Sequence, residues 1–118
     1  MTGLATTGAI ATLALGLAGF LLPARVAALV GLTPIGGPGL AEVRATYGGL
    51  FIGLGGACLL ADHPAACATA AAGWLGAALA RLLSMARDPR EPAKNVAGLV
   101  VEGGIGLMLL TGALPGNL

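Results

Sequence analysis

Residues 3–22 read GLATTGAIATLALGLAGFLL, a run of twenty residues without a charged side chain. A helix rises about 1.5 Å per residue, so this run is long enough to cross the roughly 30 Å hydrocarbon core of a bilayer. Three more apolar runs of similar length follow, and none shows the sustained alternation of apolar and polar residues that favours strands. The sequence therefore predicts an all-α integral membrane four-helix bundle. Its expected spans are residues 3–22, 39–61, 65–86 and 95–114.

The composition of the chain supports a lipid environment. Of the 118 residues, 57% are hydrophobic and 9% are charged, and the mean hydropathy is +0.93. A soluble domain carries about 25% charged residues, so the lipid bilayer is the expected partner. The 21 glycines suit helices that pack closely in lipid. A net charge of +1 without a basic run gives no footprint for nucleic acid, and one domain covering residues 1–118 is expected.

Proline and glycine mark the ends of the predicted spans. The breaking segments are Leu22-Pro23, residues 33–38, Asp62-His63-Pro64 and residues 87–94. Residues 23–32 are expected to form a short interfacial helix after the first span, with Pro23 at its first position. Asn95 is expected to cap the last helix.

The basic residues predict an orientation. All of them lie in, or near the ends facing, the first and third loops, which four spans place on one side of the membrane. Cytoplasmic loops are enriched in Lys and Arg, so this side is expected to be cytoplasmic, with both termini outside a bacterial inner (cell) membrane. These residues are Arg25, Arg44, Arg81, Arg87, Arg90 and Lys94.

Four ionisable residues lie inside the predicted spans: Glu42, Arg44, Arg81 and Glu102. Such residues are costly in a membrane and raise a functional hypothesis. Counted from the cytoplasmic ends, they occupy overlapping depths, where two carboxylates and two guanidiniums can neutralise one another. Two interpretations stay open: a structural ion-pair network, or a polar pocket near the cytoplasmic side.

Helical spacing places several of these groups on faces rich in small residues, where helices approach closely. The faces comprise Glu42, Thr46, Gly49, Gly53 and Gly56 on the second span; Cys67, Ala70, Trp74, Arg81 and Ser84 on the third; and Asn95, Gly98, Glu102, Gly106 and Ala113 on the fourth. The predicted ligand-binding residues are Arg44, Tyr47, Trp74, Arg81, Ser84 and Asn95. Tyr47 is interpreted as a phenolic donor or an interfacial anchor, and Trp74 as a packing residue or a ring that stacks on a ligand.

The two cysteines lie symmetrically about the turn at Asp62. An antiparallel hairpin would bring Cys58 and Cys67 near each other, either as a disulfide on the outer side or as two unpaired core thiols. His63 has no second His or Cys at ligand spacing, so no metal site is predicted. The absence of nucleotide and catalytic motifs likewise predicts no cofactor.

The stretch Glu42-Val-Arg44-Ala-Thr-Tyr47-Gly48-Gly49 resembles the signature of a bacterial family of small four-helix integral membrane proteins, a domain of unknown function. Ala80-Arg81-Leu-Leu-Ser84, Glu102 and the Pro-Ala-Arg-Val-Ala segment after the first span resemble that family too. The resemblance implies the fold and groups Glu42, Arg44, Tyr47, Arg81 and Glu102 together, but it brings no activity. A looser likeness links the chain to DoxX-type four-helix proteins.

Three functions are compatible with these features. The first is binding or handling of a small lipophilic or amphipathic molecule, which includes transport by a homo-oligomer. Small multidrug exporters resemble the chain in length and helix number, but their essential Glu lies in the first helix, which is uncharged here. The second is a cofactor-independent membrane enzyme of isomerase, cyclase or epoxide-opening type, with Glu42 or Glu102 as general acid/base. The third is a structural or assembly partner.

Overall fold

The computed structural model describes residues 1–115, and this part of the chain is helical without strands. Four helical stretches are long and apolar enough to cross a membrane, which confirms the four predicted apolar helices. The elements are α1 (Gly3–Leu21), α2 (Pro23–Leu29), α3 (Gly36–Val43), η1 (Arg44–Gly49), α4 (Leu50–Ala61), α5 (Pro64–Arg87) and α6 (Pro92–Ala113). The second long stretch is composite, because α3, η1 and α4 run on as one helix, Gly36–Ala61.

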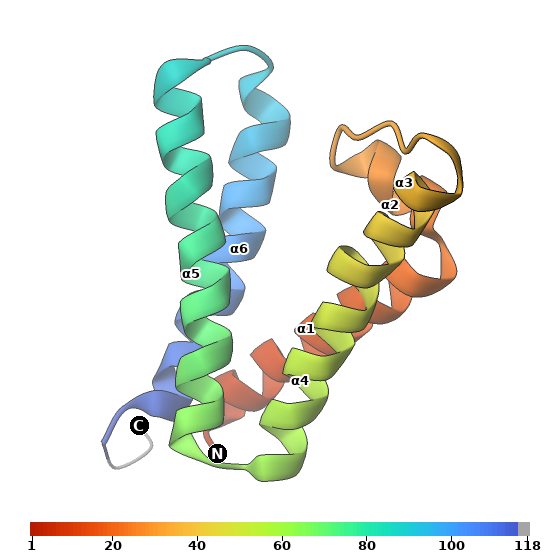
Figure 1. Ribbon diagram of the computed structural model, residues 1–118. Coiled ribbons are helices and arrows are strands. Elements are labelled where there is room, and N and C mark those ends of the chain that lie inside the picture. Colours follow the sequence, from red (N-terminus) through yellow and green to blue (C-terminus); the bar gives the residue numbers. More distant parts are fainter. Residues whose placement is uncertain (116–118) are drawn as a thin grey trace.

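The helices form two arms (Figure 1). The first arm comprises α1 to α4, in which α1 packs along α4 and η1, and the second is the α5–α6 hairpin. The arms meet at the end that holds the N-terminus and the α4–α5 turn, where α1 also packs on α6. They diverge toward the end that holds α2, α3 and the α5–α6 loop (Figure 1). We call these the joined end and the open end.

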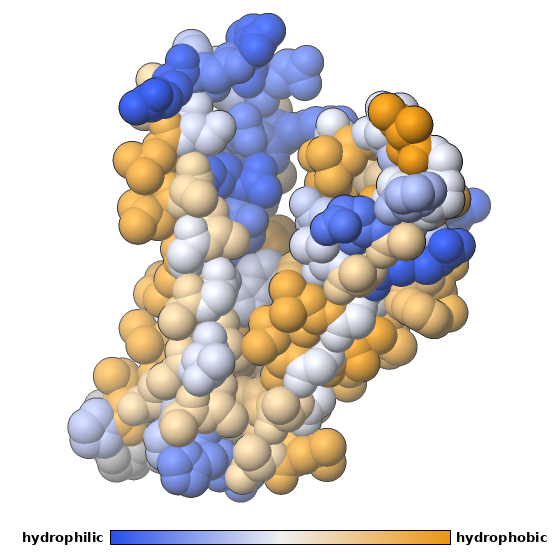
Figure 2. All heavy atoms as spheres, in the orientation of Figure 1, coloured by the Kyte–Doolittle hydropathy of each residue, from blue (hydrophilic) through white to orange (hydrophobic). Residues whose placement is uncertain are grey.

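The buried core lies toward the joined end and consists mostly of small side chains. Its largest member is Trp74, which packs among alanines and both cysteines. The large apolar residues lie mainly outside: Leu60 is 90% exposed and Leu79 is 59% exposed. Figure 2 shows this apolar outer surface, with hydrophilic residues gathered toward the open end. Since lipid tails are as apolar as leucine, such a surface suits a bilayer rather than water.

Two helix starts differ from the prediction. The second stretch begins at Gly36 rather than residue 39, since Pro38 lies in the first turn, where a missing N–H costs no hydrogen bond. The last helix begins at Pro92, whose fixed φ suits the first helical position. The prediction that Asn95 caps this helix is therefore wrong. Asn95 lies one turn inside α6, and Glu91, at a φ of 49°, precedes the helix.

The first arm depends on a close crossing of α1 with η1. A Cβ on Gly19 would overlap the carbonyl oxygen of Tyr47, and one on Gly48 would lie 2.9 Å from the backbone nitrogen of Phe20. Backbone therefore packs directly on backbone here, as small residues allow in membranes. This crossing fixes where Tyr47 and the rest of η1 lie relative to α1.

The π-helix η1 changes which face of the second stretch is packed. The predicted face with Glu42, Thr46, Gly49, Gly53 and Gly56 does not meet a neighbouring helix, because a Cβ on Gly53 or Gly56 would have nothing within 4 Å. Gly48 and Gly55 contact α1 instead. A π-helix places more residues in each turn than an α-helix, so a face counted at 3.6 residues per turn rotates away. The predicted face on α6 does pack, since Gly106 contacts Leu75 of α5.

Candidate functional site

The second arm carries a polar cluster formed by Arg81, Glu102 and Asn95. The Arg81 guanidinium donates through Nε to Oε1 of Glu102 and through its second terminal nitrogen to Oε2, at 3.2 Å. Its first terminal nitrogen donates to Oδ1 of Asn95 at 3.0 Å. Arg is suited to this two-pronged contact because its planar donors match a carboxylate. The cluster is not closed off: the Arg81 side chain is 29% exposed and that of Glu102 is 14% exposed.

The Arg81 side chain packs on a face of helix α6 at which a glycine leaves room for it. Asn95, Gly98 and Glu102 share one face of α6, as their spacing predicts. A Cβ on Gly98 would lie 2.7 Å from Cζ of Arg81, so the guanidinium lies directly over this glycine. Both hydrogen-bonding partners then flank the guanidinium, one on either side along the helix.

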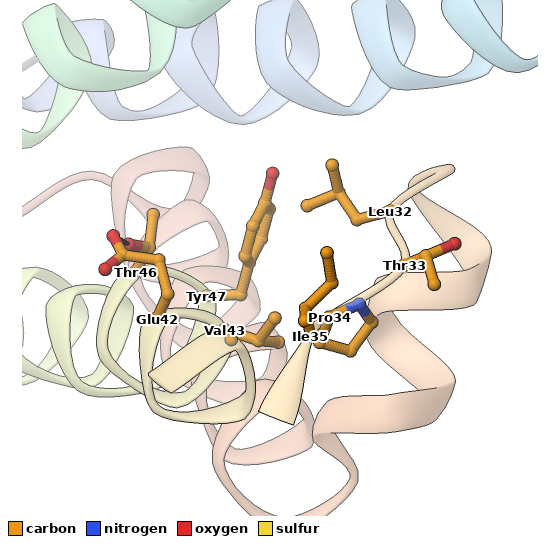
Figure 3. A pocket seen from close by; sticks show the side chains of 9 residues that line it. Leu32, Thr33, Pro34, Ile35, Glu42, Val43, Thr46 and Tyr47 are labelled. Carbon is orange, nitrogen blue, oxygen red and sulfur yellow. Dashed lines mark hydrogen bonds between the residues drawn. The ribbon is translucent and has the colours of Figure 1, made fainter. Parts of the chain in front are cut away.

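The first arm contributes a hollow of about 380 Å³ near the open end. Its lining is mostly apolar, with polar groups supplied by Thr33, Glu42, Thr46 and Tyr47. Thr46 Oγ1 donates to Oε1 of Glu42 at 3.2 Å. Figure 3 shows the Tyr47 ring pointing away from its own arm, toward the ribbons of α5 and α6. The lining residues are Leu32, Thr33, Pro34, Ile35, Gly39, Glu42, Val43, Thr46 and Tyr47.

The polar groups of the two arms face a common hollow. Figure 2 shows the molecule hollowed between its arms toward the open end, with hydrophilic surface on the second arm facing this space. The Tyr47 phenol points from the first arm toward α5 and α6, the helices that carry Arg81 and Glu102. Lys94 reaches across from α6, where Nζ donates to the carbonyl oxygen of Ala28 in α2 at 3.4 Å. We call the space between Tyr47 and the Arg81–Glu102 pair the inter-arm cleft.

A chain of aromatic contacts links the inter-arm cleft to the core. The Tyr47 and Phe51 rings meet edge to face at 6.1 Å, and the Phe51 and Trp74 rings lie 4.7 Å apart. Trp74 Nε1 donates to Oγ1 of Thr12 at 2.9 Å, and Thr12 in turn donates to the carbonyl of Gly8. The indole is buried with its N–H satisfied, so Trp74 is placed as a core residue rather than at the cleft.

The structure brings only some of the predicted site residues together. Arg81 contacts both Glu102 and Asn95, and Tyr47 points from the other arm toward the helices that carry them. Glu42 lines the hollow of the first arm without joining the Arg81 cluster. Arg44 and Ser84 are exposed, and the hydrogen bonds of the Arg81–Glu102 pair include neither.

Sequence reasoning missed the segment from Leu32 to Ile35. These residues connect α2 to α3 and form one wall of the hollow, where Leu32 points in the same direction as Tyr47 (Figure 3). Ile35 is 84% exposed, as many of the large apolar residues of this chain are. The sequence signal for this wall was Ile35, an apolar residue within the predicted turn Thr33-Pro34-Ile35-Gly36.

A second, smaller hollow of about 100 Å³ lies beside the α5–α6 loop, lined in part by Asp88 and Arg90. The Arg90 side chain donates to both carboxylate oxygens of Asp88, and its backbone N–H donates to Oδ1. These bonds, chiefly those of the side chain, lower the pKa of Asp88 below its ordinary value. The pair is solvent-exposed, so it shapes the loop and contributes little to stability.

No protein-family model, curated protein or solved structure matches the chain. Within residues 1–115, no group of three or more His, Cys, Asp or Glu side chains is placed to hold a metal ion.

Proposed function

We propose that this membrane protein binds a small lipophilic or amphipathic molecule in the inter-arm cleft. The observation that carries the proposal is the partial exposure of the Arg81–Glu102 pair, which lies on the two helices that border the hollow between the arms. A purely structural pair is expected to be enclosed between packed helices, since desolvated charges need every partner satisfied. The pair is instead left partly accessible, although neither of its residues lines the hollow of the first arm itself.

The lining of the first-arm hollow, which adjoins the inter-arm cleft at Tyr47, supports an amphipathic ligand. Leu32, Pro34 and Val43 supply apolar contact, while the Tyr47 phenol and the Glu42 carboxylate supply a donor and an acceptor. Most ligand sites combine a mainly apolar lining with a few convergent polar groups. The expected ligand thus has an alkyl or ring portion and at least one hydrogen-bonding group. The family resemblance of residues 42–49 stays a prediction.

Photoaffinity labelling tests the proposal. The chain in lipid nanodiscs is exposed to dodecyl amphiphiles that carry a diazirine and an amine, carboxylate or alcohol headgroup. We expect one headgroup class to label Leu32, Val43 and Tyr47 saturably, and a non-photoreactive analogue to compete. The lipid-exposed Leu60 and Leu79 serve as internal controls, at which labelling is not competed.

Variants sharpen this experiment. Tyr47→Phe and Glu102→Gln are expected to reduce the competed labelling at Leu32 at least about tenfold, the effect of losing one charge-assisted hydrogen bond of about 1.5 kcal/mol. Thr69→Val is the matched control, because its hydroxyl is exposed and donates only to the Ala65 carbonyl of its own helix. Ligand binding would be refuted if labelling at each residue followed only the exposure of its side chain and the non-photoreactive analogue did not reduce it.

We further propose that the open end faces the cytoplasm of a bacterial cell, because Arg25, Arg87 and Lys94 lie in or beside its loops. Arg90→Cys and His63→Cys test this orientation, as both positions are exposed and lie in opposite turns. The native cysteines are buried and should not react. In intact cells an impermeant maleimide is expected to label the His63→Cys chain only. Labelling of the Arg90→Cys chain before lysis would reverse the orientation.

A second candidate is a cofactor-independent membrane enzyme, and one observation favours Glu42 as its base. Both carboxylate oxygens of Glu102 are engaged by the Arg81 guanidinium. Glu42 lines the hollow and accepts a hydrogen bond from Thr46 alone among the hydrogen bonds described. A base must reach the proton it abstracts, so Glu42→Gln, which keeps an acceptor oxygen but cannot take up the proton, would abolish turnover while reducing the competed photolabelling far less.

A further inference from the structure

Three sulfur atoms form a triangle at the joined end, far from the inter-arm cleft. Sγ of Cys58 and Sγ of Cys67 lie 3.3 Å apart. Sδ of Met1 lies 3.5 Å from the Cys67 sulfur and 3.9 Å from the Cys58 sulfur. The chain has two cysteines and three methionines, and both cysteines and one methionine meet at this point.

Separate elements bring the three sulfurs together. Cys58 lies in the last turn of α4, Cys67 in the first turn of α5, and Met1 precedes α1. Thr2 accepts from the N–H of Ala5 as the cap of α1, and its Oγ1 hydrogen bonds to Oγ1 of Thr111 on α6 at 2.8 Å. The amino group of Met1 lies 3.1 Å from Oδ1 of Asp62. The methionine is thereby held over the two thiols.

The size of the triangle matches a three-coordinate metal site. A metal bound to three sulfurs at about 2.3 Å, the length of a zinc–thiolate bond, spaces them about 4.0 Å apart. The three observed separations, 3.3, 3.5 and 3.9 Å, need only a small expansion. A disulfide would require the two thiol sulfurs to approach to about 2.05 Å, and both cysteines are free.

The donor set selects the class of metal. Thiolate and thioether ligands favour soft ions such as Cu(I), whereas Mg²⁺ and Ca²⁺ require oxygen ligands. Structural zinc takes four ligands, and residues 1–115 offer only two from His, Cys, Asp and Glu at this point. The site is also enclosed, as Cys58 and Cys67 are fully buried and the Met1 side chain is 8% exposed. Such enclosure keeps water and oxidants from a monovalent copper ion.

We infer that Cys58, Cys67 and Met1 form a binding site for a soft monovalent metal ion of the Cu(I) class. The metal replaces the proton of each thiol that binds it, and the protons pass to solvent. No change of oxidation state is involved. Because α4, α5 and the segment before α1 each supply one ligand, the bound ion joins the two arms at their common end.

Competition with a chromogenic Cu(I) chelator tests the site, using the reduced chain in nanodiscs without oxygen. We expect one Cu(I) per chain. Cys58→Ser and Cys67→Ser should each weaken binding more than about 100-fold, beyond the 10–100-fold that loss of a supporting group costs. Met85→Leu is the matched control, since it removes a methionine at the open end and should leave affinity unchanged.

X-ray absorption of the Cu(I)-loaded wild-type chain needs no variant, so a folding defect does not weaken the test. Three sulfur neighbours at about 2.3 Å are expected from the triangle. The site would be overturned if the wild-type chain bound Cu(I) no more tightly than the Cys58→Ser/Cys67→Ser double variant does. So would nitrogen or oxygen neighbours in place of sulfur, or a Cys58–Cys67 disulfide, two daltons lighter, in freshly isolated membranes.

Discussion

Replacing Gly19 with alanine is expected to destabilise the first arm by about 3 kcal/mol, the upper end of the usual cost of overpacking. The added Cβ would overlap the carbonyl oxygen of Tyr47, which is backbone and cannot rotate away. The α1–η1 crossing would have to open, and Tyr47 would lose its position in the inter-arm cleft. Thermal unfolding of the detergent-solubilised chain, followed by loss of the monodisperse gel-filtration peak, measures this effect.

Gly53→Ala is the matched control for this substitution. Gly53 lies in the helix that crosses α1, but a Cβ there has nothing within 4 Å. Alanine is the better helix former by about 1 kcal/mol, so this variant should be as stable as the parent chain or slightly more so. If the Gly19 and Gly53 variants unfold at the same temperature, the close backbone crossing is wrong.

Breaking the Arg81–Glu102 pair is expected to cost up to about 3 kcal/mol, the low end of the 3–5 kcal/mol for a fully buried pair, because Arg81 is 29% exposed. Glu102→Leu leaves the Arg81 guanidinium with Asn95 as its remaining partner. Arg81→Leu likewise leaves an unpaired carboxylate. The double variant removes both charges, so it should be more stable than either single variant. Thermal unfolding of the four chains gives this coupling as a double-mutant cycle.

The same cycle separates structure from function. In the double variant, folding should be largely restored while the competed photolabelling of Leu32 stays lost, because the Arg81–Glu102 pair proposed to hold the polar end of the ligand is absent. Asp88→Asn is the control, as it breaks an exposed loop pair and should leave the unfolding temperature unchanged. Restored labelling in the double variant would assign the pair a structural role only.

The long helices were predictable because a bilayer imposes length and polarity together. An uncharged run such as residues 3–22 has few alternatives to a spanning helix. Helix starts were less predictable, since Pro92 and Asn95 both carry start signals and only the proline is used. The packed face of the second stretch was predicted wrongly, because η1 departs from the period of 3.6 on which the pattern depends.

The part of the candidate site that lies on the second arm could be predicted from the sequence. The spacing of Asn95, Gly98 and Glu102 on one helix face, at the depth of Arg81, indicated the cluster that the structure shows. The separation of Glu42 from this cluster could not be predicted, since depth along a span says nothing about the divergence of two arms. The wall from Leu32 to Ile35 was missed because a loop has no period from which to place its side chains.

Ligand binding in the inter-arm cleft is best tested by determining two structures of the chain in lipid nanodiscs, one purified without added amphiphile and one with the labelling amphiphile bound. We expect elongated non-protein density in the inter-arm cleft, with its polar end within hydrogen-bonding distance of the Tyr47 phenol or the Arg81–Glu102 pair. Arms closed on each other, with Tyr47 packed against the pair and no density between them under either condition, would contradict it.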